Sequence, residues 1–350
     1  MTINMMKRLS STLVSSLCVL VLVCIASNAV HAQATVKAIK ARGVLICAVT
    51  PDLPGFSATN SDGKYIGLDV DACRAAAAAI LGDAEKVKYV TVSSAERFTT
   101  LQSGTIDILS AASSWTYTRN TKLALESTGV NFYTGSAFLV KKSLGVESAK
   151  KLDGATICDV QGTTNEYAVA DFNTNNHIKI NSLVFDDMKQ VTAALQSGRC
   201  DGYVNDVASD AILALQLKQS GADFVILPEL ISKNPQGPFV RQGDEQFYNI
   251  VKFAFFAMVQ AEEFGITSAN VDQIRGATTD PRVRKFLGVE GDLGSMLGLS
   301  KDCYYNVVKQ VGNYGESFER NVGMQSTLKL ARGLNAQWTN GGLMYSPPFD

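Results

Sequence analysis

The chain has 350 residues, of which 46% are hydrophobic, so it can bury a sizeable core. Its 32 basic and 33 acidic residues nearly balance, which argues against nucleic acid or an anionic membrane surface as a partner. The length predicts two structural lobes.

The first 32 residues predict a secretory signal peptide. Lys7 and Arg8 supply a basic start, residues 13–25 an apolar stretch, and residues 30–32 a small-residue cleavage site. The apolar stretch is shorter than the ~20 residues that a membrane-spanning helix needs. Cys24 follows bulky residues where a lipoprotein signal has small ones, which argues against a lipid anchor. We therefore expect a soluble exported protein with 30 basic and 33 acidic residues, a formal charge of −3.

Five cysteines remain after the predicted cleavage, so at least one of them lacks an intramolecular partner. Cys158 and Cys200 both lie in strand-like runs and form one candidate pair. Cys47, in another strand-like run, and Cys73, at the start of an alanine-rich helix, form a second; Cys303 is the fifth cysteine. The sequence leaves the connectivity open. Because no C-x-x-C occurs, neither a zinc site nor a thioredoxin-type redox site is indicated.

The first half of the mature chain alternates strands and helices. We expect strands at residues 43–46, 87–92 and 106–109, and helices at residues 72–81 and 95–104. This βαβαβ order predicts a parallel sheet covered by helices on both faces, in which ligands bind beyond the carboxyl ends of the strands. The loop at residues 50–57 and the turn at residues 113–119 both lie at that edge and could face one cleft.

Small and hydroxyl residues follow the strand at residues 106–109, and the run ends at Arg119. A guanidinium matches a carboxylate bidentately, and hydroxyls such as those of Ser114 and Thr116 add donors without a competing negative charge. Together with Ala112, these residues form a candidate seat for a small carboxylic acid. The alternative is that Arg119 lies on the first turn of a solvated helix.

A second alternating block predicts two further binding groups. Thr163 and Glu166 have the spacing of a capping box at a helix start, where free backbone N–H groups beside Thr164 could hold an anion. Asp206 ends a strand at residues 202–204 and could pair with an ammonium group; its alternative role is to cap the following helix. An anion seat combined with an ammonium seat predicts a zwitterionic guest such as a free α-amino acid.

Five stretches carry a resemblance to a known family: IGLDVDACRAAA (66–77), LQSGTIDIL (101–109), SSWTYTR (113–119), KLDGATICDVQGTTNE (151–166) and ALQSGRCDGYVND (194–206). In this order, and over roughly residues 36–286, the sequence resembles the periplasmic substrate-binding proteins of amino-acid ABC importers, solute-binding protein family 3.

The resemblance implies roles for individual residues. Arg119, helped by Ser114, would clamp the α-carboxylate, Thr164 would donate to the same carboxylate, and Asp206 would accept from the α-ammonium. The family usually places an aromatic residue over the ligand side chain, in the loop after the first strand. This sequence has Leu53 there, with Phe56 three residues on.

The resemblance also implies an α/β fold of two lobes joined by crossing strands near residues 135–138 and 238–240. Lobe one would comprise residues 35–137 and 239–290, and lobe two residues 138–238. The apolar face of a helix at residues 247–263, with Phe247, Val251, Ala254 and Met258, is expected to be core. Residues 291–350 resemble the extension of the general L-amino acid-binding subgroup and would pack on lobe one.

The implied function is that of a monomeric periplasmic receptor without cofactor or metal. It would close its lobes over a free L-amino acid and deliver it to an inner-membrane ABC permease.

The opposing hypothesis is an exported enzyme similar to cyclohexadienyl or arogenate dehydratases, which share this fold. His177 is the only histidine after the predicted cleavage and lies in a polar loop, where a solvated side chain is expected. The sequence has no G-x-S-x-G, H-E-x-x-H or glycine-rich nucleotide motif. An acid–base mechanism that uses Asp52 and Asp206 stays open.

Overall fold

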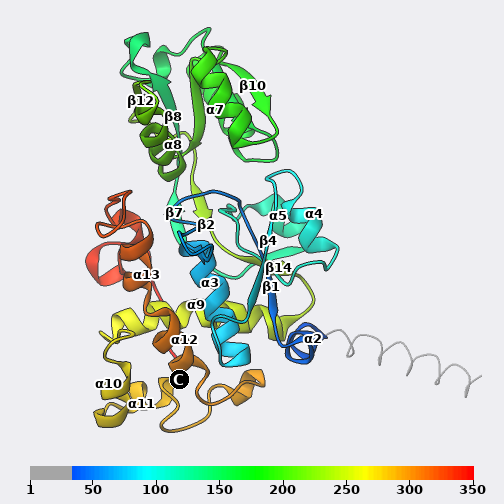
Figure 1. Ribbon diagram of the computed structural model, residues 1–350, viewed down its shortest axis with the longest axis vertical. Helices are drawn as coiled ribbons and strands as arrows, with labels where there is room; N and C mark the ends of the chain where they lie inside the picture. Colours follow the sequence, from blue (N-terminus) through cyan, green and yellow to red (C-terminus); the bar gives the residue numbers. More distant parts are fainter. Residues whose placement is uncertain (1–33) are drawn as a thin grey trace, which may run out of the picture.

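The computed structural model describes residues 34–350, and the predicted signal peptide lies outside them. Two five-stranded sheets, each flanked by helices, form two lobes that Figure 1 shows one above the other. The predicted two-lobe α/β architecture is thus confirmed. We call the part around the first sheet lobe one and the part around the second sheet lobe two. Within residues 34–350, no helix combines the length and the apolar character needed to cross a membrane.

The sheet of lobe one has the order β4-β1-β5-β14-β6. Its strands are β1 (Leu45–Val49), β4 (Val87–Thr91), β5 (Ile108–Leu109), β6 (Leu125–Ser127) and β14 (Phe239–Arg241). β1 pairs in parallel with β4 and β5, whereas β14 pairs antiparallel with β5 and β6. Four of the five residues of β1 are buried, as is usual for a central parallel strand covered on both faces. A small hairpin of β2 (Ala58–Thr59) and β3 (Tyr65–Ile66) lies before the first long helix.

Helices cover both faces of this sheet, and the longest helices bury much of their own surface. They are α2 (Ala34–Arg42), α3 (Leu68–Leu81), α4 (Arg97–Gln102), α5 (Tyr117–Thr121) and α9 (Glu245–Glu263). All five alanines at residues 75–79 are buried, because their small side chains let α3 pack closely against its neighbours. The residues of α9 that were expected to be core, at positions 247, 251, 254 and 258, are all buried, which confirms that prediction.

The sheet of lobe two has the order β10-β9-β11-β8-β12. Its strands are β8 (Ser136–Lys141), β9 (Thr156–Val160), β10 (Asn181–Phe185), β11 (Gly202–Asp206) and β12 (Phe224–Ile226). Its helices are α6 (Asn165–Asn176), α7 (Met188–Ser197) and α8 (Val207–Gln219). β9, β10 and β11 run parallel, so the starts of α6 and α8 lie at one edge of the sheet, beyond the carboxyl ends of β9 and β11.

Two crossing strands connect the lobes. β7 (Phe132–Thr134) pairs antiparallel with β13 (Asn234–Gln236), and Tyr133 lies opposite Pro235. The first crossing continues into β8 of lobe two, and the second returns to β14 of lobe one. The paired strands thus lie a few residues before the positions expected from the sequence, 135–138 and 238–240, which belong largely to β8 and β14. We call the pair of β7 and β13 the hinge pair.

The C-terminal part of the chain packs on lobe one. Its helices are α10 (Val271–Ala277), α11 (Pro281–Phe286), α12 (Cys303–Val311) and α13 (Tyr314–Asn321). α12 packs against α3 and α9, and α13 contacts the same two helices. Figure 1 shows this region, in orange and red, alongside α3. We refer to residues 291–350 as the extension.

Both candidate cysteine pairs form disulfides. Cys47 is bonded to Cys73, and this disulfide links β1 to α3. Cys158 is bonded to Cys200, and this disulfide links β9 to the second residue before β11. Cys303 is free and buried in the first turn of α12. The two pairings that the sequence left open are therefore confirmed.

Candidate functional site

A cavity of about 560 Å³ lies between the lobes and is lined by residues of both. Six of the eight predicted site residues line it: Leu53, Ala112, Ser114 and Arg119 of lobe one, and Thr164 and Asp206 of lobe two. The cavity is bordered by the carboxyl ends of strands, where ligands bind in sheets of this kind.

The turn after β5 is held in place by a buried carboxylate from another element. Asp69, in the first turn of α3, accepts hydrogen bonds from the backbone N–H of Ala112 at 2.8 Å and the hydroxyl of Ser110 at 3.2 Å. Ala112 has a φ of 42°, an uncommon conformation for a residue other than glycine. The bond to Asp69 thus stabilises the tight turn that brings Ser114 and Arg119 to the cavity.

Arg119 is buried and forms no ion pair within the described part of the chain. Its Nη1 donates to the backbone oxygen of Ser114 at 2.7 Å, and its guanidinium lies 4.5 Å from the ring centre of Phe98. Burial lowers the pKa of Arg119 to about 10, so the side chain stays protonated at neutral pH. A buried cation without a counter-ion favours an anionic guest at this position.

Arg97 is a second buried cation on the cavity wall, and the sequence analysis did not identify it. Its Nη1 donates to the hydroxyl of Ser94 and its Nη2 to the backbone oxygen of Gly162 in lobe two, both at 3.2 Å. Its Nε has no hydrogen-bond partner among residues 34–350. Burial and, secondarily, the charge of Arg119 lower the pKa of Arg97 to about 9. One signal was present in the sequence: a cation on the first turn of a helix opposes the helix dipole.

Asp206 lines the same cavity from lobe two, and it is the N-cap of α8, the alternative role considered in the sequence analysis. It accepts from the backbone N–H of Ser209 at 3.2 Å and from the hydroxyl of Ser209 at 3.0 Å. The side-chain amide of Gln236, in the hinge pair, donates to it at 3.3 Å. Burial raises the pKa of Asp206 above its usual range, and no cation of the described residues neutralises its charge. The site therefore suits a cationic group such as an ammonium.

The start of α6 differs from the capping box expected from the sequence. Thr164 occupies the N-cap position, and its side chain makes no capping bond in the described structure. The hydroxyl of Thr163 instead accepts from the N–H of Asn165 at 3.2 Å and donates to Asp159 at 3.3 Å. The predicted box of Thr163 and Glu166 is therefore wrong. Without a capping bond, the Thr164 hydroxyl remains available to a ligand in the cavity.

Two predicted site residues do not line the cavity. Phe56 is buried in the core of lobe one, where its ring packs edge-on against Phe132 at 5.1 Å. The loop turns back at this point, because Leu53 and Ser57 form a β-bridge, and this turn directs Phe56 inward. Thr116 is the N-cap of α5 and accepts from the backbone N–H of Arg119 at 3.2 Å. Thr116 therefore fixes the backbone of Arg119 from outside the cavity.

Of the residues considered for catalysis, the two aspartates line the cavity and the histidine does not. Asp52 lines the cavity together with Asp206, whereas His177 is exposed at the C-terminal end of α6 in a left-handed conformation.

The comparisons with known proteins identify the family of the chain. Residues 45–269 match the family described as bacterial extracellular solute-binding proteins, family 3. The glutamate/glutamine/aspartate/asparagine-binding protein BztA of Rhodobacter capsulatus is 49% identical over 90% of this chain and 93% of its own. The general L-amino acid-binding periplasmic protein AapJ of Rhizobium johnstonii is 48% identical over 90% of this chain and 92% of its own.

A solved periplasmic binding protein from Brucella ovis with glutathione bound has 45% sequence identity and a TM-score of 0.86, covering 90% of this chain and 98% of its own. The resemblance noted in the sequence is therefore confirmed: this protein belongs to the bacterial extracellular solute-binding proteins of family 3.

Proposed function

We propose that this protein is a periplasmic receptor that binds free L-amino acids between its lobes and delivers them to an inner-membrane ABC permease. One observation carries the proposal: a buried cation, Arg119, and a buried anion, Asp206, line one cavity from opposite lobes, and neither is paired within residues 34–350. A zwitterion complements this pair of charges. The names of two relatives, which describe binding of L-amino acids, support the same conclusion.

In the proposed complex the α-carboxylate bonds to Arg119, Ser114 and Thr164, and the α-ammonium bonds to Asp206. Closure of the lobes excludes water, which strengthens both ion pairs. The protein is exported by residues 1–32 and acts as a monomer, without catalysis of its own.

The ligand side chain lies toward Arg97, Leu53 and Asp52 in this arrangement. Arg97 lines the cavity and keeps a positive charge at neutral pH, which complements polar and acidic side chains. We therefore propose glutamate, glutamine, aspartate and asparagine as substrates, the set that the name of the Rhodobacter capsulatus relative contains.

A second candidate guest is glutathione. The cavity of about 560 Å³ has the volume of sites that hold drug-sized ligands, and the Brucella ovis relative was solved with glutathione bound. The γ-glutamyl end of glutathione carries a free α-ammonium and a free α-carboxylate, the two groups that Asp206 and Arg119 complement. Competition between glutathione and L-glutamine in calorimetry tests whether both use the same site.

A thermal-shift screen over the twenty L-amino acids tests the proposed function. A ligand at a hundred times its Kd should stabilise the protein by about 2.7 kcal/mol, which raises the melting temperature by roughly 5 °C. We expect the largest shifts with the four proposed substrates and none with their D-enantiomers. The proposal fails if no L-amino acid shifts the transition. Formation of product from arogenate over hours of incubation would instead support the enzyme hypothesis.

A further inference from the structure

A buried carboxamide of the extension forms two hydrogen bonds with the hinge pair. The Oδ1 of Asn335 accepts from the backbone N–H of Tyr133 at 2.6 Å, and its Nδ2 donates to the backbone oxygen of Tyr133 at 3.0 Å. Asn335 is 4% exposed and lies 202 residues from Tyr133 in the chain. This side chain thus fills both hydrogen-bonding positions of one residue in β7, as a neighbouring strand would.

The partner of Tyr133 in β13 offers no donor to the backbone oxygen of Tyr133. Tyr133 lies opposite Pro235, which has no N–H to donate. The backbone oxygen of Pro235 accepts instead from the N–H of Trp115 at 2.7 Å. Asn335 therefore occupies the edge of β7 that faces away from β13.

Neighbouring residues of the extension hold Asn335 and the start of the crossing in place. The Nε of Arg332 donates to the backbone oxygen of Asn335 at 3.0 Å, and its Nη2 pairs with Glu262 of α9 at 3.1 Å. The hydroxyl of Tyr314 donates to the backbone oxygen of Asn131, just before β7, at 2.9 Å. The extension thus contacts the crossing at two successive points.

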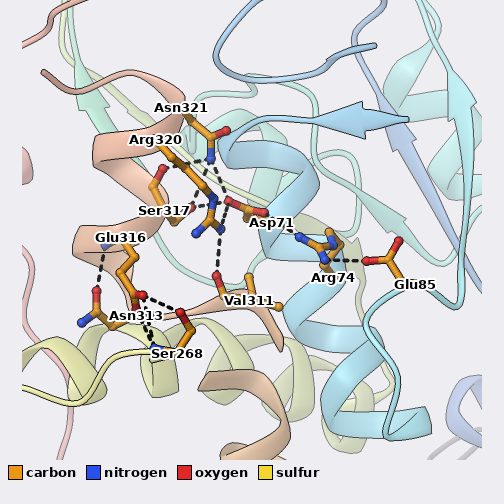
Figure 2. Close-up of polar contacts among 10 residues, drawn as sticks. All are labelled: Asp71, Arg74, Glu85, Ser268, Val311, Asn313, Glu316, Ser317, Arg320 and Asn321. Carbon is orange, nitrogen blue, oxygen red and sulfur yellow. Dashed lines mark hydrogen bonds and ion pairs between the residues drawn. The ribbon is translucent and has the colours of Figure 1, made fainter. Parts of the chain in front are cut away.

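The helix that carries Tyr314 is anchored on α3, as Figure 2 shows. Three side chains of α13 donate to one oxygen of Asp71: the hydroxyl of Ser317 at 2.6 Å, Arg320 at 2.5 Å and Asn321 at 2.7 Å. Asp71 is only 3% exposed. Hydrogen bonds to a charged group are stronger in such a buried environment than at the surface. The extension is therefore fixed to the rigid core of lobe one.

The hinge pair in turn contacts binding residues of both lobes. Gln236 of β13 forms a β-bridge with Ser114 in the turn of lobe one and donates to Asp206 in lobe two. Asn131 also donates to Asp69 at 3.0 Å, the carboxylate that holds Ala112. A displacement of β7 or β13 would therefore move the groups that face the ligand from both sides.

We propose that the extension is a brace for the hinge: Asn335, fixed to lobe one through α13 and Arg332, holds β7 in the register that aligns Ser114 and Asp206. It is a positioning residue and does not contact the ligand. Without the brace, the aligned arrangement is only one of several that the hinge pair adopts. The apparent affinity for the ligand then falls in proportion to the fraction of molecules in the aligned arrangement. The proposal relies on ligand binding between the lobes but not on the roles assigned to Arg119 or Arg97.

The test compares Asn335→Ala with a matched control, Gln310→Ala. Gln310 makes the same kind of contact at the opposite end of α3: its Oε1 accepts from the N–H of Ala84 at 2.8 Å, and its Nε2 donates to the oxygen of Gly82 at 2.9 Å. L-glutamine is the probe, with affinity measured by calorimetry and dissociation by stopped-flow fluorescence. We expect Asn335→Ala to weaken binding 5- to 30-fold through faster dissociation, and Gln310→Ala to change it less than 2-fold.

Hydrogen exchange of the empty protein supplies a readout that does not depend on the ligand. Asn335→Ala should accelerate exchange in residues 131–136 while the peptides of α9 stay protected. The brace is refuted if exchange of this segment is unchanged, or if both variants lower affinity equally or not at all. Should Asn335→Ala fail to fold, Tyr314→Phe, which removes one hydrogen bond to the crossing, decides by the same criteria. If the parent protein binds no L-amino acid, the proposed function fails, and the exchange experiment still tests the brace.

Discussion

Buried charges on the cavity wall are the residues that distinguish this molecule from an ordinary two-lobe scaffold. Arg119 and Arg97 are cations without carboxylate partners in residues 34–350, and Asp206 is an anion without a cation. Burying an unpaired charge costs folding free energy, so the empty protein carries a strain that a ligand of opposite charges relieves. The same burial keeps water from screening the ion pairs once they form.

Arg119→Ala should weaken binding of L-glutamine at least 30-fold. The truncation leaves the ligand carboxylate buried and unpaired, which costs about 2 to 5 kcal/mol. The melting temperature of the empty protein should stay nearly constant, because the variant also removes a buried, unpaired cation. Arg282→Ala is the control, since the Arg282 side chain is 74% exposed. Unchanged affinity of Arg119→Ala by calorimetry would show that the carboxylate binds elsewhere.

Asp159 should make the stability of the empty protein depend on pH. The side chain of Asp159 is buried, and one of its oxygens has no hydrogen-bond partner in the described structure. Burial, more than any other cause, raises the pKa of Asp159 from 3.8 to about 7. At a pH between these two pKa values, Asp159 has lost its proton in the unfolded chain but retains it in the folded protein. Stability therefore falls as pH rises, by about 1.4 kcal/mol per unit for this group, and the loss is complete above about pH 7.

Urea unfolding of the parent and of Asp159→Asn at pH 4.5, 6 and 8 measures this contribution. Asp159→Asn should lie closer to the parent in stability at pH 4.5 and gain roughly 3 kcal/mol relative to it by pH 8. Equal pH slopes in both proteins would show that Asp159 titrates normally.

Among the secondary-structure elements, those with local signals were predicted well. The helix expected at residues 72–81 ends at the same residue as α3, because Gly82 ends it in a left-handed conformation. The hinge strands have three residues each, too few for periodicity to locate, and their pairing depends on contacts a hundred residues apart. The capping box at Thr163 failed because the N-cap lies one residue later, at Thr164, and the Thr163 hydroxyl accepts from the N–H of Asn165.

The disulfide of Cys158 and Cys200 ties β9 to the chain just before β11. It closes a loop with a sequence separation of 42 residues, for which chain entropy predicts about 4 kcal/mol of stabilisation. Replacing both cysteines with serine should lower the free energy of unfolding by about 2 to 4 kcal/mol, measured with urea. L-glutamine affinity should change little, because neither cysteine lines the cavity. A variant as stable as the parent would show that the bond is dispensable.

The whole molecule places its binding groups by folding distant segments together, and this limits what sequence can predict. Six of eight candidate residues line the cavity because they follow strands whose carboxyl ends, in the sheets of both lobes, border it. Phe56 was misplaced because the loop after β1 turns inward, which no local pattern signals. Arg97 was missed because its burial depends on Gly162 of the other lobe, 65 residues away.

The account depends on one zwitterionic guest held by charges from both lobes. A crystal structure of the protein with L-glutamine tests this most directly. We predict that the α-carboxylate contacts the guanidinium of Arg119 and that the α-ammonium contacts the carboxylate of Asp206, with Thr164 beside the carboxylate. A ligand bound between the lobes with its carboxylate away from Arg119, or bound outside this cavity, would contradict the account.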